Sequence, residues 1–578
     1  MEMTKYIVVV GGVISGVGKG VSTASLGKIL QQYGYGVTAI KIDPYINYDA
    51  GTLRPTEHGE VWVTDDGGEI DQDLGNYERF LGLDIPRANN ITTGQIYKEV
   101  IDRERRGEFL GQTVQFIPHI PDEIKRRVRQ AGTGNDFVLI EIGGTIGDYE
   151  NIPFLFAMKS LERELPPRSV GYILVTYLPV PGHIDEMKTK PTQQAIRQLS
   201  ESGIIPDFII CRANQPLDLV RKKKIETYAN IRTDHVISAP DLKSIYDIPQ
   251  TLEKDNLGRK ILRHFGLTAR KKPSWRRWEE LAAMTQKAKP VVKVAMVGKY
   301  TASGSFGMTD AYVSINESLQ HAAAHAGTKV AITWLDAQRL EKTGRTEEEL
   351  SEFDGILIPG GFGAGGVEGK IKAITWAREK KVPFLGICYG MQLAVVEYAR
   401  NVCGLTGSHT TEVAPRAKHP VIDILPAQKK ILQQNQYGGT MRLGSYAAIL
   451  DPKSGVYQLY RQQGRLKEDK ERIELLLKKP DELFRLGIAY GSQHIILERH
   501  RHRYEVSPRY AAELEKKGMV FSGWHHRTDG AKLMEFLELP THPFFIASQA
   551  HPEFKSRLES PAPLFLGFVT AMVKRFRK

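Results

Sequence analysis

Two sets of residues in this 578-residue chain have the types and spacing that catalysis requires. Near the amino terminus, Gly11–Gly20 reads GGVISGVGKG and directly follows the apolar run Tyr6–Val10. Near the carboxyl terminus, Cys388 stands in the sequence GICYG, and His551 and Glu553 follow far downstream in HPE. A glycine-rich loop binds phosphates, and a nucleophilic thiol attacks acyl groups. The pair predicts an enzyme that makes a reactive intermediate in one half and supplies it from the other.

The glycine-rich loop connects a predicted strand to a predicted helix over Ser22–Gln32. Backbone N–H groups in such a loop and the positive end of the helix hold phosphates, and Lys19 adds a point charge. A Ser or Thr that binds magnesium usually follows this lysine, but the residue here is Gly20. Glycines alone also fit a simple tight turn. If the loop binds a nucleotide, other residues must hold the metal.

Acidic residues at two places are candidate metal ligands. Glu69–Asp73 reads EIDQD, and Glu141 closes the apolar run Phe137–Ile140. An acid at the carboxyl end of a parallel strand lies where open α/β sheets bind ligands. Magnesium takes one or two carboxylates together with phosphate oxygens. On residue types alone either acid can be a surface residue, and the apolar flank of Glu141 favours it as a ligand.

The residues around Cys388 predict a nucleophile elbow. Small residues on both sides let a strand turn sharply into a helix and present the side chain between them. In an extended segment His551 and Glu553 face the same side, so Glu553 can orient His551 as the base toward the thiol. The glycine turn Pro359–Gly363 is expected to add a backbone N–H to that of Tyr389 in an oxyanion hole. A buried structural cysteine is the alternative interpretation.

The composition limits the class of protein. With 41% hydrophobic and 25% charged residues, the chain is typical of a globular enzyme, and its length exceeds that of one core. Three cysteines exclude a disulfide framework and a CxxC metal pattern. We see no membrane-spanning run or signal peptide, so we expect a cytoplasmic enzyme without a membrane partner. The net charge of +12 attracts anions; with no zinc-finger or RNA-binding motif, we expect nucleoside triphosphates and no nucleic acid.

The elements that position these residues follow an α/β pattern twice. β-Branched apolar runs alternate with amphipathic stretches, as in a parallel sheet wrapped by helices. The pattern fades after Leu267, a basic proline-containing stretch follows, and a second series starts at Val291. We expect an exposed, charged helical insertion at 462–482. The predicted strands are Tyr6–Val10, Gly36–Ile40, Phe137–Ile142, Gly171–Thr176, Asp207–Cys211, Val291–Val297, Gly355–Pro359 and Pro383–Ile387.

Three longer motifs closely resemble the CTP synthase family, and the resemblance runs over nearly the whole chain. They are KIDPYIN at Lys41–Asn47, EIGGTIGD at Glu141–Asp148 and KTKPTQ at Lys188–Gln193. The carboxy-terminal half resembles a class I glutamine amidotransferase. The resemblance implies two doubly wound parallel-sheet α/β domains: a P-loop-type amidoligase (synthetase) over 1–267 and a glutaminase over 291–578, joined by a linker at 268–290.

The resemblance implies a reaction and its ligands. The amino-terminal domain would use ATP and Mg²⁺ to phosphorylate O4 of UTP, and ammonia would displace the phosphate to give CTP. The carboxy-terminal domain would release that ammonia from L-glutamine by a Cys-His-Glu glutaminase. GTP is expected as an allosteric activator, CTP as an inhibitor, and the enzyme as a homotetramer in pyrimidine biosynthesis.

The resemblance also implies site residues by position. The catalytic residues would be Cys388, His551 and Glu553, and the metal ligands Asp73 and Glu141. The ATP site would comprise Gly16, Val17, Gly18, Lys19, Gly20, Val21, Asp73, Pro240, Asp241 and Leu242. The UTP and CTP site would comprise Ser15, Asp148, Tyr149, Glu150, Lys188, Thr189, Lys190, Pro191, Thr192, Gln193 and Lys224. The glutamine site would comprise Gly361, Tyr389, Gly390, Met391, Gln392, Glu412 and Arg503.

Two other classes share parts of this pattern. A cobyrinate-type amidotransferase activates a carboxylate but lacks the motif at Lys188–Gln193. A partitioning or signalling ATPase of the deviant phosphate-loop kind would bind nucleotide without amidotransfer. The first predicts no CTP from UTP, and the second predicts no glutaminase activity.

Overall fold

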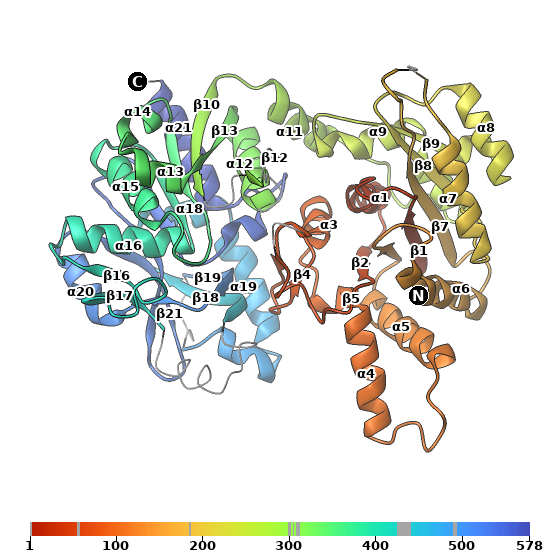
Figure 1. The fold of residues 1–578 in the computed structure, drawn as a ribbon, viewed down its shortest axis with the longest axis horizontal. Helices are drawn as coiled ribbons and strands as arrows, with labels where there is room; N and C mark the ends of the chain where they lie inside the picture. Colours follow the sequence, from red (N-terminus) through yellow and green to blue (C-terminus); the bar gives the residue numbers. More distant parts are fainter. Residues whose placement is uncertain are drawn as a thin grey trace. The chain divides into compact units, whose positions relative to one another are not determined.

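The computed structural model describes residues 3–54, 58–183, 186–298, 312–424, 441–488 and 494–577, with the backbone of two short strands at 302–303 and 306–307. The chain forms two compact units (Figure 1). Unit 1 comprises Met1–Leu53 and Glu69–Ala282, and unit 2 comprises Arg54–Gly68 and Ala283–Lys578. Each unit has its own sheet and its own core.

Unit 1 is built on a seven-stranded sheet in the order β5-β2-β6-β1-β7-β8-β9, in which all neighbouring strands are parallel. The strands read as unbroken apolar runs because helices cover both faces. In β6, Glu141 lies in register with Val9 on one neighbour and Lys41 on the other. The strands are β1 Lys5–Gly11, β2 Val37–Asp43, β5 Asn90–Thr92, β6 Phe137–Ile142, β7 Val170–Tyr177, β8 Phe208–Ala213 and β9 Val236–Pro240.

The helices of unit 1 follow the strands in the crossover pattern that parallel pairing requires. The pair α4 and α5 projects from the sheet as a hairpin (Figure 1). The helices are α1 Lys19–Gln32, α3 Asp73–Leu81, α4 Thr93–Arg105, α5 Phe116–Gly132, α6 Ile152–Glu164, α7 Lys190–Glu201, α8 Leu219–Ala229, α9 Ile248–Lys254, α10 Leu257–His264 and the first part of α11 (Arg276–Lys287), whose last residues belong to unit 2.

The stretch that was expected to be a linker is anchored on unit 1. Trp278 of α11 is buried and donates a hydrogen bond from its ring nitrogen to the carbonyl of Tyr246 at 2.7 Å. Arg270 donates two hydrogen bonds to Asp136, at 2.6 and 3.0 Å, and lies over the ring of Tyr35. The basic stretch therefore carries structural contacts, and unit 1 extends to Ala282.

Unit 2 is built on a nine-stranded sheet in the order β13-β10-β14-β15-β23-β22-β21-β18-β19. The first five strands are parallel and the remaining pairs are antiparallel. The α/β class is confirmed. This sheet is mixed, where a wholly parallel one was expected. Short turns join β21, β22 and β23, and a short turn can join only antiparallel strands. The strands are β10 Val291–Gly298, β13 Lys329–Asp336, β14 Gly355–Ile358, β15 Phe384–Ile387, β18 Arg442–Leu450, β19 Ile495–His502, β21 Val520–His526, β22 Lys532–Glu538 and β23 Phe545–Ser548.

Helices cover both faces of this sheet, and each face has its own buried apolar cluster. A small sheet of β16 Ser408–Thr410, β17 His419–Asp423 and β20 Glu505–Val506 adjoins it. The helices are α12 Val313–Ala326, α13 Ala337–Thr343, α14 Thr346–Leu350, α15 Val367–Glu379, α16 Tyr389–Asn401, α18 Gly455–Gln462, α19 Arg465–Leu476, α20 Pro508–Lys516 and α21 Pro563–Phe576. No helix among the described residues has the length and apolar character to cross a membrane.

The charged insertion is helical but is not simply exposed. Arg465 and Asp469 of α19 are buried, and Arg465 pairs with both Asp469 and Glu498 at 3.3 Å. Tyr460 donates a hydrogen bond to the same Glu498 at 2.9 Å. Composition predicted a solvated helix, but charges of opposite sign on β19 allow one face of α19 to be buried.

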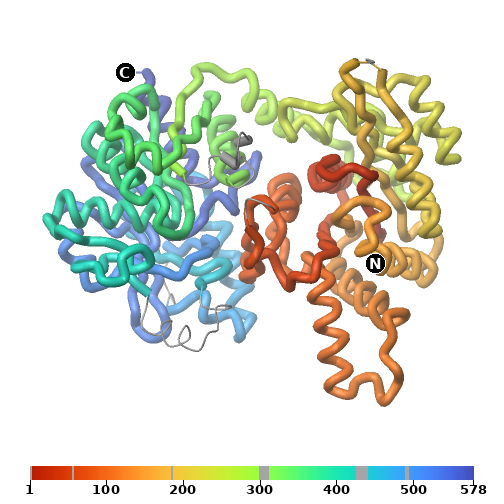
Figure 2. The backbone as a smooth tube through the Cα atoms, in the orientation of Figure 1, coloured from red at the N-terminus to blue at the C-terminus, as the bar shows by residue number. Residues whose placement is uncertain are grey.

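A short stretch of the amino-terminal half folds with unit 2. The chain leaves unit 1 after Leu53 and re-enters it at Glu69, a course that can be followed in Figure 2. This stretch, called the 54–68 segment below, contains the strand β3 (Trp62–Val63) and a turn in which Gly68 donates to the Thr64 hydroxyl at 2.8 Å. The sequence pattern had assigned it to the amino-terminal domain.

Candidate active sites

The glycine-rich loop lies between β1 and α1. Gly16 and Gly18 have φ of 71° and 77°, a conformation that glycine adopts without strain. Lys19 begins α1 and donates a hydrogen bond from Nζ to the carbonyl of Gly144. Burial lowers the pKa of Lys19, and the carboxylates of unit 1 oppose that effect. The loop therefore has backbone N–H groups and one ammonium group at the amino end of a helix, which is the arrangement that binds phosphate.

The missing hydroxyl after Lys19 has a structural explanation. A Cβ atom placed on Gly20 would lie 2.2 Å from Oδ1 of Asp73. The carboxylate of Asp73 thus occupies the space that a Ser or Thr side chain would fill. An acid brought by α3 stands where other phosphate loops carry their metal-binding hydroxyl.

Four carboxylates surround the ammonium of Lys41, which is buried. Lys41 Nζ contacts Asp73 and lies 3.1 Å from Glu141 Oε1; Asp43 and Asp71 lie at 3.8 and 4.0 Å. Burial lowers the pKa of Lys41, but Asp73 and Glu141 outweigh it and hold that pKa well above its ordinary value. Burial raises the pKa of Asp71 to about 7 and that of Asp43 to about 6. The cluster has more negative than positive charge and attracts cations.

The donor set fits a magnesium ion that is also bound by phosphate. Within the described ranges, no three His, Cys, Asp or Glu side chains form a complete metal site. Magnesium does not need one, because it uses one or two carboxylates with phosphate oxygens and water. Asp73 and Glu141 both contact Lys41, so one small cation with a bound phosphate can reach both.

The structure brings the motif Lys188–Gln193 toward the glycine-rich loop. Thr192 is buried, and its hydroxyl lies 3.1 Å from that of Thr176 at the end of β7. A Cβ atom on Gly12 would lie 3.0 Å from the same Thr176 hydroxyl. The amino end of α7, which carries Lys190 and Pro191, therefore lies beside the start of the loop.

The other predicted nucleotide residues differ in how firmly they are held. Asp148 accepts hydrogen bonds from Thr145 N at 2.5 Å and from Thr145 Oγ1 at 2.7 Å. Lys188 pairs with Glu186 at 2.5 Å, in a half-buried position. Thr189, Gln193 and Val17 are buried, and Val21 and Pro240 are partly exposed. The exposed residues of the predicted set are Ser15, Gly16, Tyr149, Glu150, Lys190, Lys224, Asp241 and Leu242.

One residue near the loop was missed from the sequence. Arg212 in β8 donates a hydrogen bond to Asp241 at 2.7 Å, and a Cβ atom on Gly18 would lie 2.3 Å from its Nη1. Arg212 thus joins the loop to Asp241, which belongs to the predicted ATP site. A single arginine at the end of an apolar strand belongs to no motif, so no sequence pattern indicates its position beside the loop.

Cys388 lies in the strained turn that a nucleophile elbow requires. Its φ of 49° and ψ of −100° fall in a region that non-glycine residues rarely occupy, and it caps the amino end of α16. A Cβ atom on Gly390 would lie 2.3 Å from the carbonyl oxygen of Ile358, and one on Gly386 would lie 3.0 Å from Gly390. Gly386 is therefore required for β15 to approach α16 so closely, and Gly390 is required for α16 to approach β14.

His551 lies against the elbow and is oriented by Glu553. Its Nδ1 lies 2.6 Å from Glu553 Oε1. A Cβ atom on Gly360 would lie 2.9 Å from the His551 ring and 3.7 Å from Cys388 Cβ, so the three residues meet at one point. Burial lowers the pKa of His551, but Glu553 and Cys388 outweigh it and raise that pKa to about 10. The imidazole is held in its protonated form at neutral pH.

The predicted glutamine-binding residues lie around this elbow. Gly363 N donates to Glu412 Oε1 at 2.8 Å, and the Tyr389 hydroxyl donates to the Gly363 carbonyl at 3.1 Å. Gln392 donates to the Tyr504 carbonyl at 3.0 Å, next in sequence to Arg503. The contacts join the turn at 359–363 to α16 and to the segment after β19. The remaining predicted residues are Gly361 and Gly390 at the two turns and Met391, which is fully buried and has only its backbone to offer.

Comparison with known proteins identifies both halves. A family model described as "CTP synthase N-terminus" matches residues 5–267, and one described as "Glutamine amidotransferase class-I" matches residues 308–571. The CTP synthase of Pyrococcus abyssi is 46% identical over 569 residues, which are 98% of each chain. The chain belongs to the CTP synthase family. The resemblance inferred from the three motifs is thereby confirmed.

Other proteins match all or half of this CTP synthase family member. The CTP synthase of Methanopyrus kandleri is 47% identical over 571 residues, 98% of each chain. Among solved structures, a Trypanosoma brucei CTPS glutaminase domain with bound acivicin is 30% identical, with a TM-score of 0.40, and covers 49% of this chain and 94% of its own.

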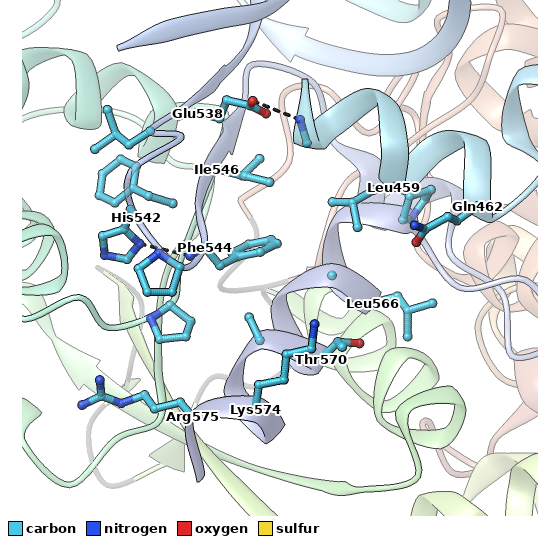
Figure 3. Close-up of a pocket in the computed structure, with 18 of the residues that line it drawn as sticks. Leu459, Gln462, Glu538, His542, Phe544, Ile546, Leu566, Thr570, Lys574 and Arg575 are labelled. Atoms are coloured by element: carbon cyan, nitrogen blue, oxygen red, sulfur yellow. Dashed lines mark hydrogen bonds between the residues drawn. The ribbon is translucent and has the colours of Figure 1, made fainter. Parts of the chain in front are cut away.

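The candidate glutaminase site does not coincide with the large pocket of unit 2. That pocket has a volume of about 1180 Å³ and lies between α18, α21 and the turn that joins β22 to β23 (Figure 3). Glu538 at its edge accepts hydrogen bonds from the amino end of α18, and His542 accepts one from Phe544 N. No proposed catalytic or glutamine-binding residue lines it. In this CTP synthase family member the candidate glutaminase residues meet at the elbow instead.

Proposed function

We propose that this enzyme converts UTP to CTP with ATP and with ammonia released from L-glutamine, as the names of its relatives indicate. The observation that carries the proposal is the presence of both centres in one chain: the loop at Lys19 with its carboxylates, and the elbow at Cys388 with His551 and Glu553. Family membership over 98% of the chain supports reading the two centres as one reaction sequence.

In the amino-terminal half, the terminal phosphoryl group of ATP is transferred to O4 of UTP. ADP leaves, ammonia attacks C4, and inorganic phosphate leaves with the former O4. Such a transfer requires positioning and neutralisation of phosphate charge more than covalent help. Lys19 and the loop N–H groups bind and orient the phosphates, with the residues proposed for ATP and UTP around them. Asp73 and Glu141 would hold Mg²⁺, which neutralises charge on phosphate oxygens.

In the carboxy-terminal half, the thiolate of Cys388 attacks the side-chain amide carbon of glutamine. The oxyanion is held by backbone N–H groups of Tyr389 and of the turn at 359–363. His551, protonated and oriented by Glu553, donates its proton to the departing ammonia and leaves a thioester. Water then attacks the thioester with His551 as base, and glutamate departs. Glu412 and Arg503 have the charges that the amino and carboxylate groups of glutamine require.

We further propose GTP activation, CTP inhibition, a homotetramer and a cytoplasmic location, all on the strength of the family resemblance. Sedimentation in the presence of ATP and UTP tests the assembly. A monomer under those conditions would contradict it.

Product analysis with two nitrogen donors tests the reaction. Cys388→Ala should abolish CTP formation from glutamine and leave formation from ammonia intact. Lys19→Ala should abolish CTP formation from both donors, because activation of UTP precedes amination. Absence of CTP from UTP, ATP and glutamine in the unmodified enzyme would favour a carboxylate-activating amidotransferase, and absence of glutaminase activity would favour a simple ATPase.

A further inference from the structure

The 54–68 segment packs against the turn that carries the glutaminase histidine and glutamate. The turn is the 3-10 helix η7 (Pro552–Lys555), which directly follows His551. The mechanism above uses none of the residues of the 54–68 segment. Three contacts of this segment, through η7, β19 and α12, nevertheless lead to His551 and Glu553.

The first contact is a row of three packed rings. The ring of His551 lies on that of Phe554, with centroids 5.2 Å apart and planes 19° from parallel. Phe554 in turn packs on Trp62, with centroids 5.0 Å apart and planes 59° apart. Trp62 is fully buried. Since Phe554 is held between Trp62 and His551, one face of the catalytic imidazole is fixed by a residue 489 positions earlier in the chain.

The second contact is an ionic one. Asp65 accepts hydrogen bonds from Arg499 Nε at 2.5 Å, from Lys555 Nζ at 3.3 Å and from the Ser445 hydroxyl at 2.8 Å. Arg499 is fully buried, and its carbonyl accepts a hydrogen bond from His551 N at 2.7 Å. Asp65 therefore links the strand that receives the His551 backbone to the last residue of η7. Burial raises the pKa of Asp65, but Lys555 and Arg499 outweigh it and hold that pKa well below its ordinary value.

A third contact strengthens the attachment. Glu60 accepts hydrogen bonds from the backbone N–H and the hydroxyl of Ser314, at the amino end of α12. One turn later in α12, Ser318 donates to the backbone carbonyl of Glu553 at 3.3 Å. A carboxylate at a helix amino end is favourable, and this one fixes the helix that contacts Glu553.

We propose that Trp62 and Asp65 are positioning residues for the glutaminase, which hold His551 and Glu553 in register with Cys388. The inference rests on the proposed glutaminase function of that triad. It implies that the carboxy-terminal half alone lacks part of its own catalytic support. The 54–68 segment that supports the triad is followed directly in the chain by Glu69–Asp73, which contains the proposed metal ligand Asp73.

The test uses the full-length enzyme and measures glutamate release, ammonia-dependent CTP formation and their pH dependence. Trp62→Ala should lower kcat for glutamine about 10- to 100-fold, because a displacement of about 1 Å in a catalytic group has that effect. KM for glutamine should stay within about twofold, since Trp62 packs on Phe554 and Asp65 holds Arg499 and Lys555, which are not among the proposed glutamine-binding residues. Ammonia-dependent CTP formation should be retained, and Trp62→Phe should recover most of the lost kcat.

Two further variants keep the proposal falsifiable if Trp62→Ala fails to fold. Asp65→Asn keeps the shape of the side chain and should lower kcat for glutamine in the same way. The basic limb of the pH profile should also move, because His551 is less well fixed. Phe576→Ala and Asp529→Asn, both exposed in unit 2, are the matched controls and should leave kcat unchanged.

The outcomes separate this proposal from the proposed function. An unchanged kcat in both Trp62→Ala and Asp65→Asn, or a change in KM alone, would overturn the positioning role. Equal loss of ammonia-dependent activity would also overturn it, because it would show a general structural defect. If the unmodified enzyme released glutamate but made no CTP, the proposed function would fail while the glutaminase comparison would still test the positioning role.

Discussion

The carboxylate of Asp73 fills the space above Gly20, so that a Cβ atom on Gly20 would lie 2.2 Å from Oδ1. The glycine is thus complementary to an acid 53 positions later, and the acid is fixed in turn by Lys41. The absence of a side chain at Gly20 and the position of the Asp73 carboxylate therefore depend on each other. The usual hydroxyl is absent, and the carboxylate of Asp73 occupies the space that it would fill.

Restoring the usual hydroxyl should therefore inactivate the enzyme. Gly20→Ser should lower ammonia-dependent CTP formation about 100-fold or more, because the new side chain must displace Asp73 from Lys41. The thermal unfolding midpoint should change little in comparison. Gly182→Ser is the matched control, since a Cβ atom there meets nothing within 4 Å. Full activity of Gly20→Ser would show that Asp73 need not stay where it is.

Local patterns were sufficient to predict most strands of the unit 1 sheet, although not β5 and β9. The strand over Tyr6–Val10 and the loop after it follow from neighbouring residues, because buried parallel strands and glycine turns are encoded within a few positions. The elbow at Cys388 was predictable for the same reason. The mixed order of the second sheet was not, since pairing of β18 with β19 and β21 depends on distant partners.

Contacts between distant residues account for what the sequence did not predict. Trp62 and Asp65 fold with unit 2 because their partners, Phe554 and Arg499, lie more than 400 positions later. The burial of one face of α19 was not predicted, because the charge of Arg465 is compensated by Glu498, an acid on strand β19. The composition of a segment gives its charges, but it does not show which charged residues of the folded chain form pairs.

The elbow should not tolerate even one added methyl group. Gly390→Ala would place Cβ 2.3 Å from the carbonyl oxygen of Ile358, a backbone atom that cannot move without shifting β14. Glutamine-dependent CTP formation should fall about 100-fold or more, because the thiol and the oxyanion hole are displaced together. Ammonia-dependent formation is the internal control. Its retention with loss of the glutamine reaction is the expected result, and equal activity with both donors would contradict the steric argument.

A buried ion cluster should dominate the stability of unit 2. Arg442 donates hydrogen bonds to Glu535 at 2.8 Å and to Glu505 at 3.2 Å, and all three side chains are buried. Arg442→Met would leave two buried carboxylates without a cation and should cost about 3–5 kcal/mol in the free energy of unfolding. Arg276→Ala, which breaks an exposed pair with Glu280, should cost about 0–1 kcal/mol.

The same cluster gives a pH dependence for Arg442→Met. Burial raises the pKa of Glu505 to about 7 even with Arg442 present, and removing the cation raises it further. A carboxyl whose pKa is higher in the folded state binds more protons there, so folding is favoured as the pH falls. The loss in the free energy of unfolding that Arg442→Met causes, measured by denaturant unfolding, should therefore be smaller at pH 5 than at pH 8. A loss that grows toward acid pH would show that the carboxyls are not the source.

Glu553 should set the pH range over which His551 remains protonated. In the folded enzyme burial opposes protonation, but Glu553 contributes most to raising the pKa of His551 from its ordinary 6.5 to about 10. The pair therefore contributes stability that is fully present below about pH 6.5 and is lost as the pH rises toward 10. Glu553→Gln keeps the shape of the side chain and removes the charge. The basic limb of the pH profile of kcat/KM for glutamine should then move toward neutral pH, because the acid that protonates ammonia is lost earlier.

The rate should fall along with that shift. An amide at position 553 no longer fixes the imidazole by its charge, and loss of such an orienting carboxylate lowers kcat by orders of magnitude in a comparable triad. Glu352→Gln, at an exposed acid paired with Lys293, is the control and should leave both the rate and the pH limb in place. If Glu553→Gln lowered kcat with the basic limb unmoved, Glu553 would orient His551 without setting its charge. The position of the basic limb, and not the size of kcat, therefore decides between two roles for the 2.6 Å contact between Glu553 and His551. A shifted limb would show that Glu553 keeps His551 protonated, and an unmoved limb would show that it only orients the ring.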